Sequence, residues 1–162
     1  MAVAGEKIVM LAIQIESAGI EFYTALKRMF SPHSSSFEII ESLLLDEYKH
    51  KKTYEILLNK IKVEKKKIIE ITPKEIEGIR ALVEGKIFDQ TEKAVKYVSQ
   101  NLDLSQLLLY ALGFELDTNY LFEKLEEKII PAEKEIIRTI LKEERTHIEK
   151  IIKLRAEIKY DN

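Results

Sequence analysis

Apolar residues recur three or four positions apart over most of this chain, which is the spacing of side chains on one face of an α-helix. The periodicity predicts four long helices, at residues 4–30, 35–66, 103–129 and 131–159. One or two shorter helices are expected within residues 67–102. Glycine and proline are scarce, at 5 and 3 residues, so little interrupts these patterns and an all-α fold is expected.

Helix-start signals support the predicted boundaries. In a capping box, a helix-capping side chain and a glutamate or glutamine three residues later bond each other's backbone N–H groups. Such pairs are Ser35 with Glu38, Thr72 with Glu75, and Asp103 with Gln106. Pro73 and Pro131 add a residue suited to the first position of a helix.

Short turns within residues 4–66 and within residues 103–159 predict two antiparallel helical hairpins. Residues 67–102 are long enough to run the length of a bundle between them. A four-helix bundle with one long crossover between its second and third helices has the connectivity of ferritin-like folds. We expect residues 1–162 to form a single domain of this kind.

Composition and charge argue against several kinds of binding partner and metal ligand. The 28 acidic and 26 basic residues nearly cancel, so no broad positive field favours nucleic acid. Because the chain has no cysteine, any metal site must use oxygen and nitrogen ligands. The N-terminus lacks a signal-peptide pattern, and no uninterrupted apolar run predicts a membrane span, so we expect a cytoplasmic protein with no membrane partner.

Four glutamates and two histidines interrupt the apolar stripes of the predicted helices. The first and third helices carry one glutamate each, whereas the second and fourth each carry a Glu-x-x-His pair. These residues are Glu16, Glu115, Glu47 with His50, and Glu144 with His147. Burying such groups is strongly unfavourable unless something pairs with them, so the pattern requires an explanation.

Each of these residues alone has a simpler interpretation. A single glutamate in an apolar stripe is commonly an edge residue, and a lone histidine is commonly a core residue with satisfied hydrogen bonds. Together, however, one glutamate from each of two helices and a Glu-x-x-His from each of the other two form the ligand set of di-iron and di-manganese carboxylate bundles. Two divalent cations would also balance four carboxylates. The sequence therefore predicts two Fe ions per chain, with Mn or Zn as alternatives.

Residues next to the predicted ligands are given supporting roles. Glu47 and Glu144 are expected to bridge the two metals. Asp46 and Glu143 each precede one of these glutamates. They are expected either to accept the free ring N–H of the histidine on the facing helix or to lie on a solvated helix face.

The aromatic residues leave several alternatives open. Tyr23, seven positions after Glu16, is predicted either to hydrogen-bond a ligand carboxylate, to act as a catalytic redox residue, or to pack in the core. Tyr54 and Tyr120 are expected to be packing residues. His33 is expected to lie exposed in a turn.

The two predicted hairpins are similar to each other in sequence. Glu16 is followed at plus seven by Tyr23, and Glu115 at plus seven by Phe122. The segment DEYKH at 46–50 likewise parallels EERTH at 143–147. An internal duplication would bring equivalent residues together around a pseudo-twofold axis at the centre of the bundle.

The chain resembles the ferritin-like superfamily, most closely the rubrerythrin-type proteins. The resemblance is carried by four segments, IESAGIEFY at 15–23, DEYKH at 46–50, FELDTNYLF at 114–122 and EERTH at 143–147. It implies O₂ or hydrogen peroxide chemistry at a di-iron centre. The chain departs from rubrerythrins in having no cysteines for a rubredoxin domain, and in having Thr118 where they have a second glutamate. We therefore expect an external electron-donor protein.

The expected function is a di-iron carboxylate oxidoreductase that reduces hydrogen peroxide or O₂. Oxidation of Fe(II) as a substrate in iron handling is the first alternative. A non-enzymatic metal-binding bundle is the second, and manganese catalase chemistry is disfavoured. A homodimer is expected, because a long crossover can be exchanged between protomers.

Overall fold

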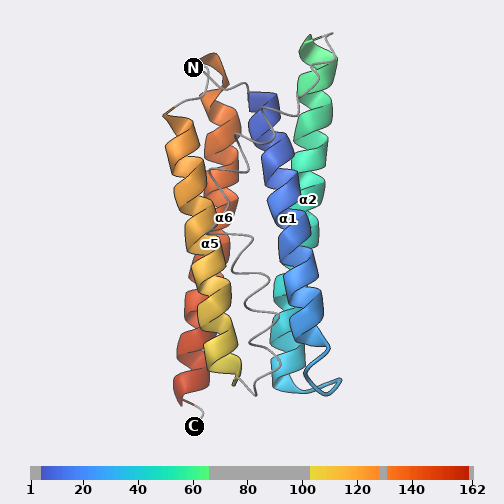
Figure 1. Cartoon of the computed structure of the whole chain (residues 1–162), viewed down its shortest axis with the longest axis vertical. Helices are drawn as coiled ribbons and strands as arrows, with labels where there is room; N and C mark the ends of the chain where they lie inside the picture. Colours follow the sequence, from blue (N-terminus) through green and yellow to red (C-terminus); the bar gives the residue numbers. More distant parts are fainter. Residues whose placement is uncertain (1–4, 66–102, 128–130, 161–162) are drawn as a thin grey trace.

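The computed structural model describes residues 5–65, 103–127 and 131–160 (Figure 1). Within these residues the chain forms the α-helices α1 (Gly5–Lys27), α2 (Ser35–Lys65), α5 (Leu104–Glu126) and α6 (Lys134–Tyr160), with a 3₁₀ turn η1 (Pro131–Glu133) before α6. This described part contains no β-strand. The expected all-α fold is thus confirmed.

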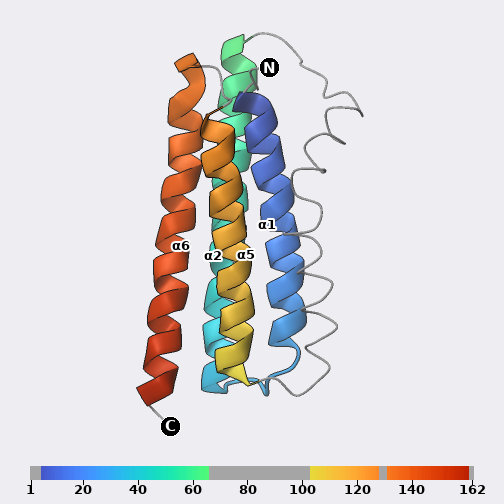
Figure 2. The same ribbon diagram turned by 60° about the vertical axis from the view of Figure 1, so that its left-hand side comes forward.

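The helices pair as two hairpins that assemble into a bundle. α1 packs mainly on α2 and α5 mainly on α6, and each pair runs antiparallel (Figures 1 and 2). The two hairpins meet where α6 approaches α1 and α2. The predicted crossover, residues 67–102, lies outside the described residues, as does the capping box expected at Thr72 and Glu75.

The start of α5 forms the capping box that the sequence predicts. Oδ1 of Asp103 accepts a hydrogen bond of 2.8 Å from the backbone N–H of Gln106. Oε1 of Gln106 accepts one of 3.1 Å from the backbone N–H of Asp103. Two N–H groups that the first turn leaves without helical partners are thereby satisfied.

The start of α2 differs by one residue from the prediction. His33 is exposed in the turn, as expected, and its positive φ of 66° turns the chain just before Ser34. Oγ of Ser34, not of Ser35, accepts the backbone N–H of Phe37 at 3.2 Å. The predicted Ser35–Glu38 box is therefore wrong, because the turn at His33 places Ser34 at the capping position.

The ends of the other helices also differ slightly from the expected ones. α1 ends at Lys27, where Met29 and Phe30 make turn hydrogen bonds back to Leu26 and Lys27. Pro131 begins the 3₁₀ turn η1, so α6 starts three residues later than predicted. Such differences are normal at helix ends, which are decided by local capping contacts.

Two apolar clusters fill the bundle. The first includes Ile8, Ile15, Tyr54, Phe122 and Ile140, and the second includes Tyr23, Leu26, Leu43, Leu108 and Ile151. On each helix the predicted metal ligands lie where one cluster gives way to the other. The ligands thus form a polar layer with apolar packing on both sides.

α1 is long and apolar enough to span a membrane by length and composition alone. However, 56% of its most apolar window is buried inside the bundle, and the buried helix of a core meets the same criterion. The helix therefore carries little weight for a membrane location, and the cytoplasmic location stays a prediction.

Candidate metal centre

The six predicted ligands come together from four helices. Glu16 lies on α1, Glu115 on α5, the pair Glu47 and His50 on α2, and the pair Glu144 and His147 on α6. The four glutamates and His147 are each only 2% exposed. His50 is half-buried. A helical period placed these side chains inward, and helix packing brings them to one level of the bundle.

His147 lies against carboxylates from two other helices. Its Nδ1 atom is 3.1 Å from Oε1 of Glu47 and 3.3 Å from Oε1 of Glu115. Nitrogen and oxygen atoms at such separations can share one metal ion after small shifts. Glu47, Glu115 and His147 therefore make one candidate ligand group, drawn from α2, α5 and α6.

His50 occupies the corresponding place in the other hairpin. Its Nδ1 atom is 3.6 Å from Oε2 of Glu16. Ligand atoms of Glu16, His50 and Glu144 lie within 4.8 Å of one another, as do those of Glu47, His50 and His147. The two imidazole rings are nearly perpendicular, with centroids 5.3 Å apart. These Glu and His groups can hold a metal ion.

Several buried polar atoms of the layer have no hydrogen-bond partner in the described part of the chain. They are Oε2 of Glu16, Oε1 of Glu47, Nδ1 of His50, and Nδ1 and Nε2 of His147. An unsatisfied buried polar atom is costly, and native proteins contain few of them. Four of these five atoms face other ligand atoms of the layer, which is the arrangement that a divalent cation would complete.

Three carboxyl groups of the layer, those of Glu16, Glu47 and Glu144, have raised pKa values. Burial raises the pKa of Glu16 and Glu47 well above the usual range, and the neighbouring carboxylates raise both further. Burial and the charge of Glu115 raise the pKa of Glu144 to about 8. These shifts express the repulsion between like charges in a low dielectric, which bound cations would relieve.

The two histidines respond in opposite directions. Burial and the positive charge of His147 together lower the pKa of His50 to about 4. Burial also opposes the charged form of His147, but the charges of Glu115, Glu47 and Glu144 outweigh it and raise its pKa to about 9. The raised pKa favours the imidazolium form of His147, and a metal ion bound there would replace its proton.

Two buried tyrosines donate hydrogen bonds to the layer. The Tyr23 hydroxyl donates to Oε1 of Glu115 at 3.3 Å, one of the alternatives predicted for it. The Tyr54 hydroxyl donates to Oε1 of Glu144 at 3.1 Å. Burial and the adjacent carboxylates raise the pKa of both phenols, so both remain donors. A catalytic role for Tyr23 stays a prediction.

The expectation that Tyr54 only packs is wrong, because it both packs in the first apolar cluster and bonds a site carboxylate. The signal that would have found it is spacing. Tyr54 follows Glu47 by seven residues, as Tyr23 follows Glu16. Two helical turns separate the members of each pair, so each tyrosine lies on the same face as its glutamate.

Asp46 has partners other than a histidine ring. Its carboxylate accepts hydrogen bonds from Lys150 on α6 and, at 2.8 Å, from Lys49. Lys150 also donates to Oγ of Ser42 at 2.6 Å. Burial raises the pKa of Asp46, but the two lysines outweigh this and lower it. Asp46 therefore ties α2 to α6. The histidine contact of Glu143, a half-buried residue, stays a prediction.

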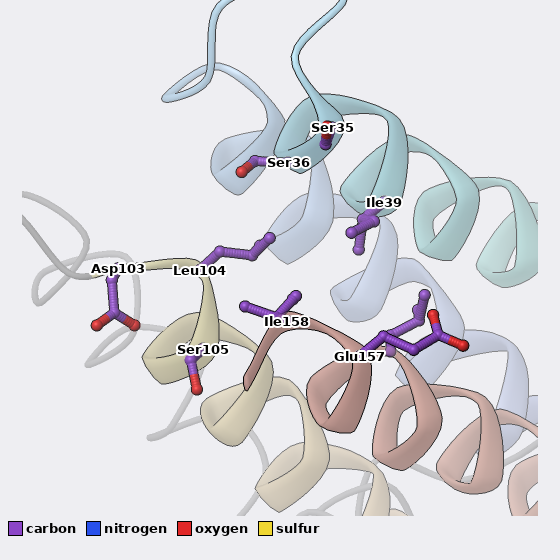
Figure 3. A pocket seen from close by; sticks show the side chains of 9 residues that line it. Ser35, Ser36, Ile39, Asp103, Leu104, Ser105, Glu157 and Ile158 are labelled. Carbon is purple, nitrogen blue, oxygen red and sulfur yellow. The ribbon is translucent and has the colours of Figure 1, made fainter. Parts of the chain in front are cut away.

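A separate hollow of about 450 Å³ lies where α2 and α5 begin and α6 ends (Figure 3). Ser35, Ser36 and Ser105 surround it with Asp103, and apolar side chains including Leu104 and Ile158 form the rest of its lining. None of the six predicted ligands lines it, and its serines are not buried. The hollow therefore adds nothing to the metal centre.

Comparisons with protein-family models, with curated proteins and with solved structures found no match to this chain. The argument for function therefore rests on the geometry and chemistry of the polar layer.

Proposed function

We propose that this chain binds two metal ions in the polar layer and acts as a di-iron carboxylate oxidoreductase of rubrerythrin-like type. The observation that carries the proposal is the convergence of four buried carboxylates and two imidazoles, from four helices, with orphaned ligand atoms facing one another. Without a cation, the fold would have to keep three of these carboxyl groups protonated against their ordinary pKa values, which is unfavourable.

The proposal of two ions rests on charge and on the internal similarity of the hairpins. Two divalent cations supply the positive charge that balances four carboxylates. In the proposed arrangement one ion takes Glu16, His50 and Glu144, and the other takes Glu115, His147 and Glu47. Each ligand of one set corresponds in the sequence similarity of the hairpins to a ligand of the other set. Glu47 and Glu144 are the proposed bridging ligands.

The ferritin-like fold is part of the same proposal. Two antiparallel hairpins with the ligand set of carboxylate bundles support it. The crossover that would complete the connectivity falls on residues 67–102, which the structure does not describe.

Iron is the proposed metal because imidazole with hard carboxylate ligands suits Fe and Mn, and zinc binds similar donors. When bound, two ferrous ions supply the two electrons that reduction of hydrogen peroxide to water requires. The chain contributes binding, a layer bounded by the two apolar clusters, and protons held on the hydroxyls of Tyr23 and Tyr54.

With no cysteine in the chain, the proposed reductant for further turnovers is a separate electron-donor protein. In the ferroxidase alternative, Fe(II) itself is the substrate and the electron source. Both activities need the same six ligands. They are therefore distinguished by whether the iron reacts faster with hydrogen peroxide or with O₂.

An anaerobic Fe(II) titration followed by stopped-flow mixing with hydrogen peroxide or O₂ tests the proposal. We expect two Fe per chain and rapid growth of near-ultraviolet ferric absorption. Faster reaction with peroxide supports the peroxidase, and faster reaction with O₂ supports the ferroxidase. Binding without accelerated oxidation would favour a structural metal, and no stoichiometric binding of iron, manganese or zinc would overturn the metal centre.

A further inference from the structure

Gly19 lies on α1 one turn after Glu16, inside the buried face of the helix. The carboxyl group of Glu47 reaches across from α2 into the space that a side chain at position 19 would fill. An ideal Cβ on Gly19 would lie 2.9 Å from Cδ of Glu47, and nearer still to its Oε2 atom. Both separations are shorter than real Cβ contacts, so any side chain at this position must displace that carboxyl group.

We infer that Gly19 is a positioning residue for Glu47, retained because its missing side chain admits the carboxylate that two metals would share. This inference rests on the proposed function. It adds to the six proposed ligands a residue that would not itself bind a metal ion.

The carboxyl group of Glu47 has little freedom to move elsewhere. Its Oε1 atom faces Nδ1 of His147 at 3.1 Å. The residue is 2% exposed, so rotation toward solvent would require the helices to separate. A methyl group at position 19 would therefore shift Glu47 relative to His147.

The corresponding position in the similar second hairpin is not a glycine. Gly19 follows Glu16 by three residues, and the equivalent residue on α5, three after Glu115, is Thr118. Thr118 is fully buried and carries a branched side chain. Glycine is also among the least favourable residues in a helix interior. The contact with Glu47 explains why α1 has it.

The central test compares Gly19→Ala with wild type by anaerobic Fe(II) titration and by Co(II) binding, because Co(II) visible absorption reports coordination geometry. We expect a loss of about tenfold or more in affinity for at least one ion, the scale seen when residues that orient metal ligands are changed, together with an altered Co(II) spectrum. Gly113→Ala, the other glycine inside a described helix beyond the first residue of α1, is the control and should keep both metals.

These outcomes separate the inference from the proposed function. If wild type binds two ions and Gly19→Ala binds them with unchanged affinity and an unchanged Co(II) spectrum, the inference is overturned while the metal centre stands. If wild type binds none, the proposed function fails, and the contact itself is then decided by the metal-free measurement.

That measurement is a double-mutant cycle of Gly19→Ala and Glu47→Ala, followed by urea unfolding in chelator. Removing the carboxyl group should make Gly19→Ala more favourable than it is in wild type, because the overlap disappears. If Gly19→Ala fails to fold, the double variant should fold. Additive effects, or a double variant that also fails to fold while Glu47→Ala folds, would overturn the inference.

Discussion

Nδ1 of His147 on α6 lies 3.1 Å from Oε1 of Glu47 on α2, so a histidine of one hairpin meets a carboxylate of the other. The two residues are in different halves of the chain and on helices that do not follow one another. The candidate metal centre is therefore a property of the assembled bundle, and it joins the two hairpins through buried polar groups.

Removing ligands from α2 should remove metal. In the Glu47→Ala, His50→Ala variant we expect fewer than two Fe per chain, because both proposed ion positions lose a ligand. Iron per chain after an anaerobic titration and desalting gives the answer. A Lys52→Ala, Glu55→Ala variant on the exposed face of the same helix is the control. Two tightly bound iron ions in the ligand variant would refute the assignment.

Metal-free protein should lose stability as pH rises from 6.5 to 8. In this range folded Glu144, with a pKa of about 8, and folded His147, with a pKa of about 9, hold protons. Their ordinary values are 4.5 and 6.5, so the unfolded chain binds fewer protons. Each proton that the folded chain binds in excess of the unfolded chain lowers the free energy of unfolding by about 1.4 kcal/mol for every unit by which pH rises.

His50 changes the stability in the opposite direction, because its folded pKa of about 4 lies below its ordinary value of 6.5. Its effect falls mainly below pH 6.5. Urea unfolding in chelator at several pH values measures the net slope. With metal bound the slope should reverse, because metal displaces the protons. A metal-free stability that is level or rises between pH 6.5 and 8 would contradict the shifts of Glu144 and His147.

Tyr54→Phe should destabilise the metal-free protein by about 1–3 kcal/mol, because it leaves a buried carboxyl oxygen of Glu144 without its donor. Tyr23→Phe should cost less, since its hydrogen bond to Glu115 is longer, at 3.3 Å against 3.1 Å. Denaturant midpoints of the two variants and wild type compare them directly. Equal midpoints for Tyr54→Phe and wild type would show that the bond contributes nothing.

Glu144→Gln should weaken metal binding and stabilise the metal-free protein. The amide keeps an oxygen for Tyr54 but cannot ionise, so the folded chain no longer has to hold a proton on a carboxyl group that ionises in the unfolded chain. At pH 7.5 and without metal, we therefore expect the variant to be more stable than wild type by about 1–3 kcal/mol. It should also bind less iron. Glu149→Gln, an exposed change on α6, is the control for both measurements.

The helical period identified the site because it reports which face of each helix is buried. Glu16, Glu115 and Glu144 were predicted to lie in apolar stripes, and all are buried. Local signals were accurate where capping depends on the residues themselves, as at Asp103. They failed at Ser34, where the turn at His33 decides which serine caps the helix.

Partners of individual side chains were predicted less well. Asp46 was expected either at a histidine ring or on a solvated helix face, and it instead binds Lys150, because its position on α2 is rotated by about 100° from Glu47. Tyr54 was expected only to pack, because a tyrosine in an apolar stripe shows nothing about where its hydroxyl ends. Both outcomes depend on the facing helix.

By itself the sequence determined that the described chain is helical, where most helices begin, and that the six predicted ligands lie on buried faces. These properties follow from the 3.6-residue period and from short-range capping. Only the tertiary structure decided that Glu47 meets His147, that Tyr54 meets Glu144, and that Gly19 makes room for a carboxylate. The reason is that a helical period fixes which face is buried, whereas contacts between helices depend on their relative rotation and height, which are set by packing of the whole core.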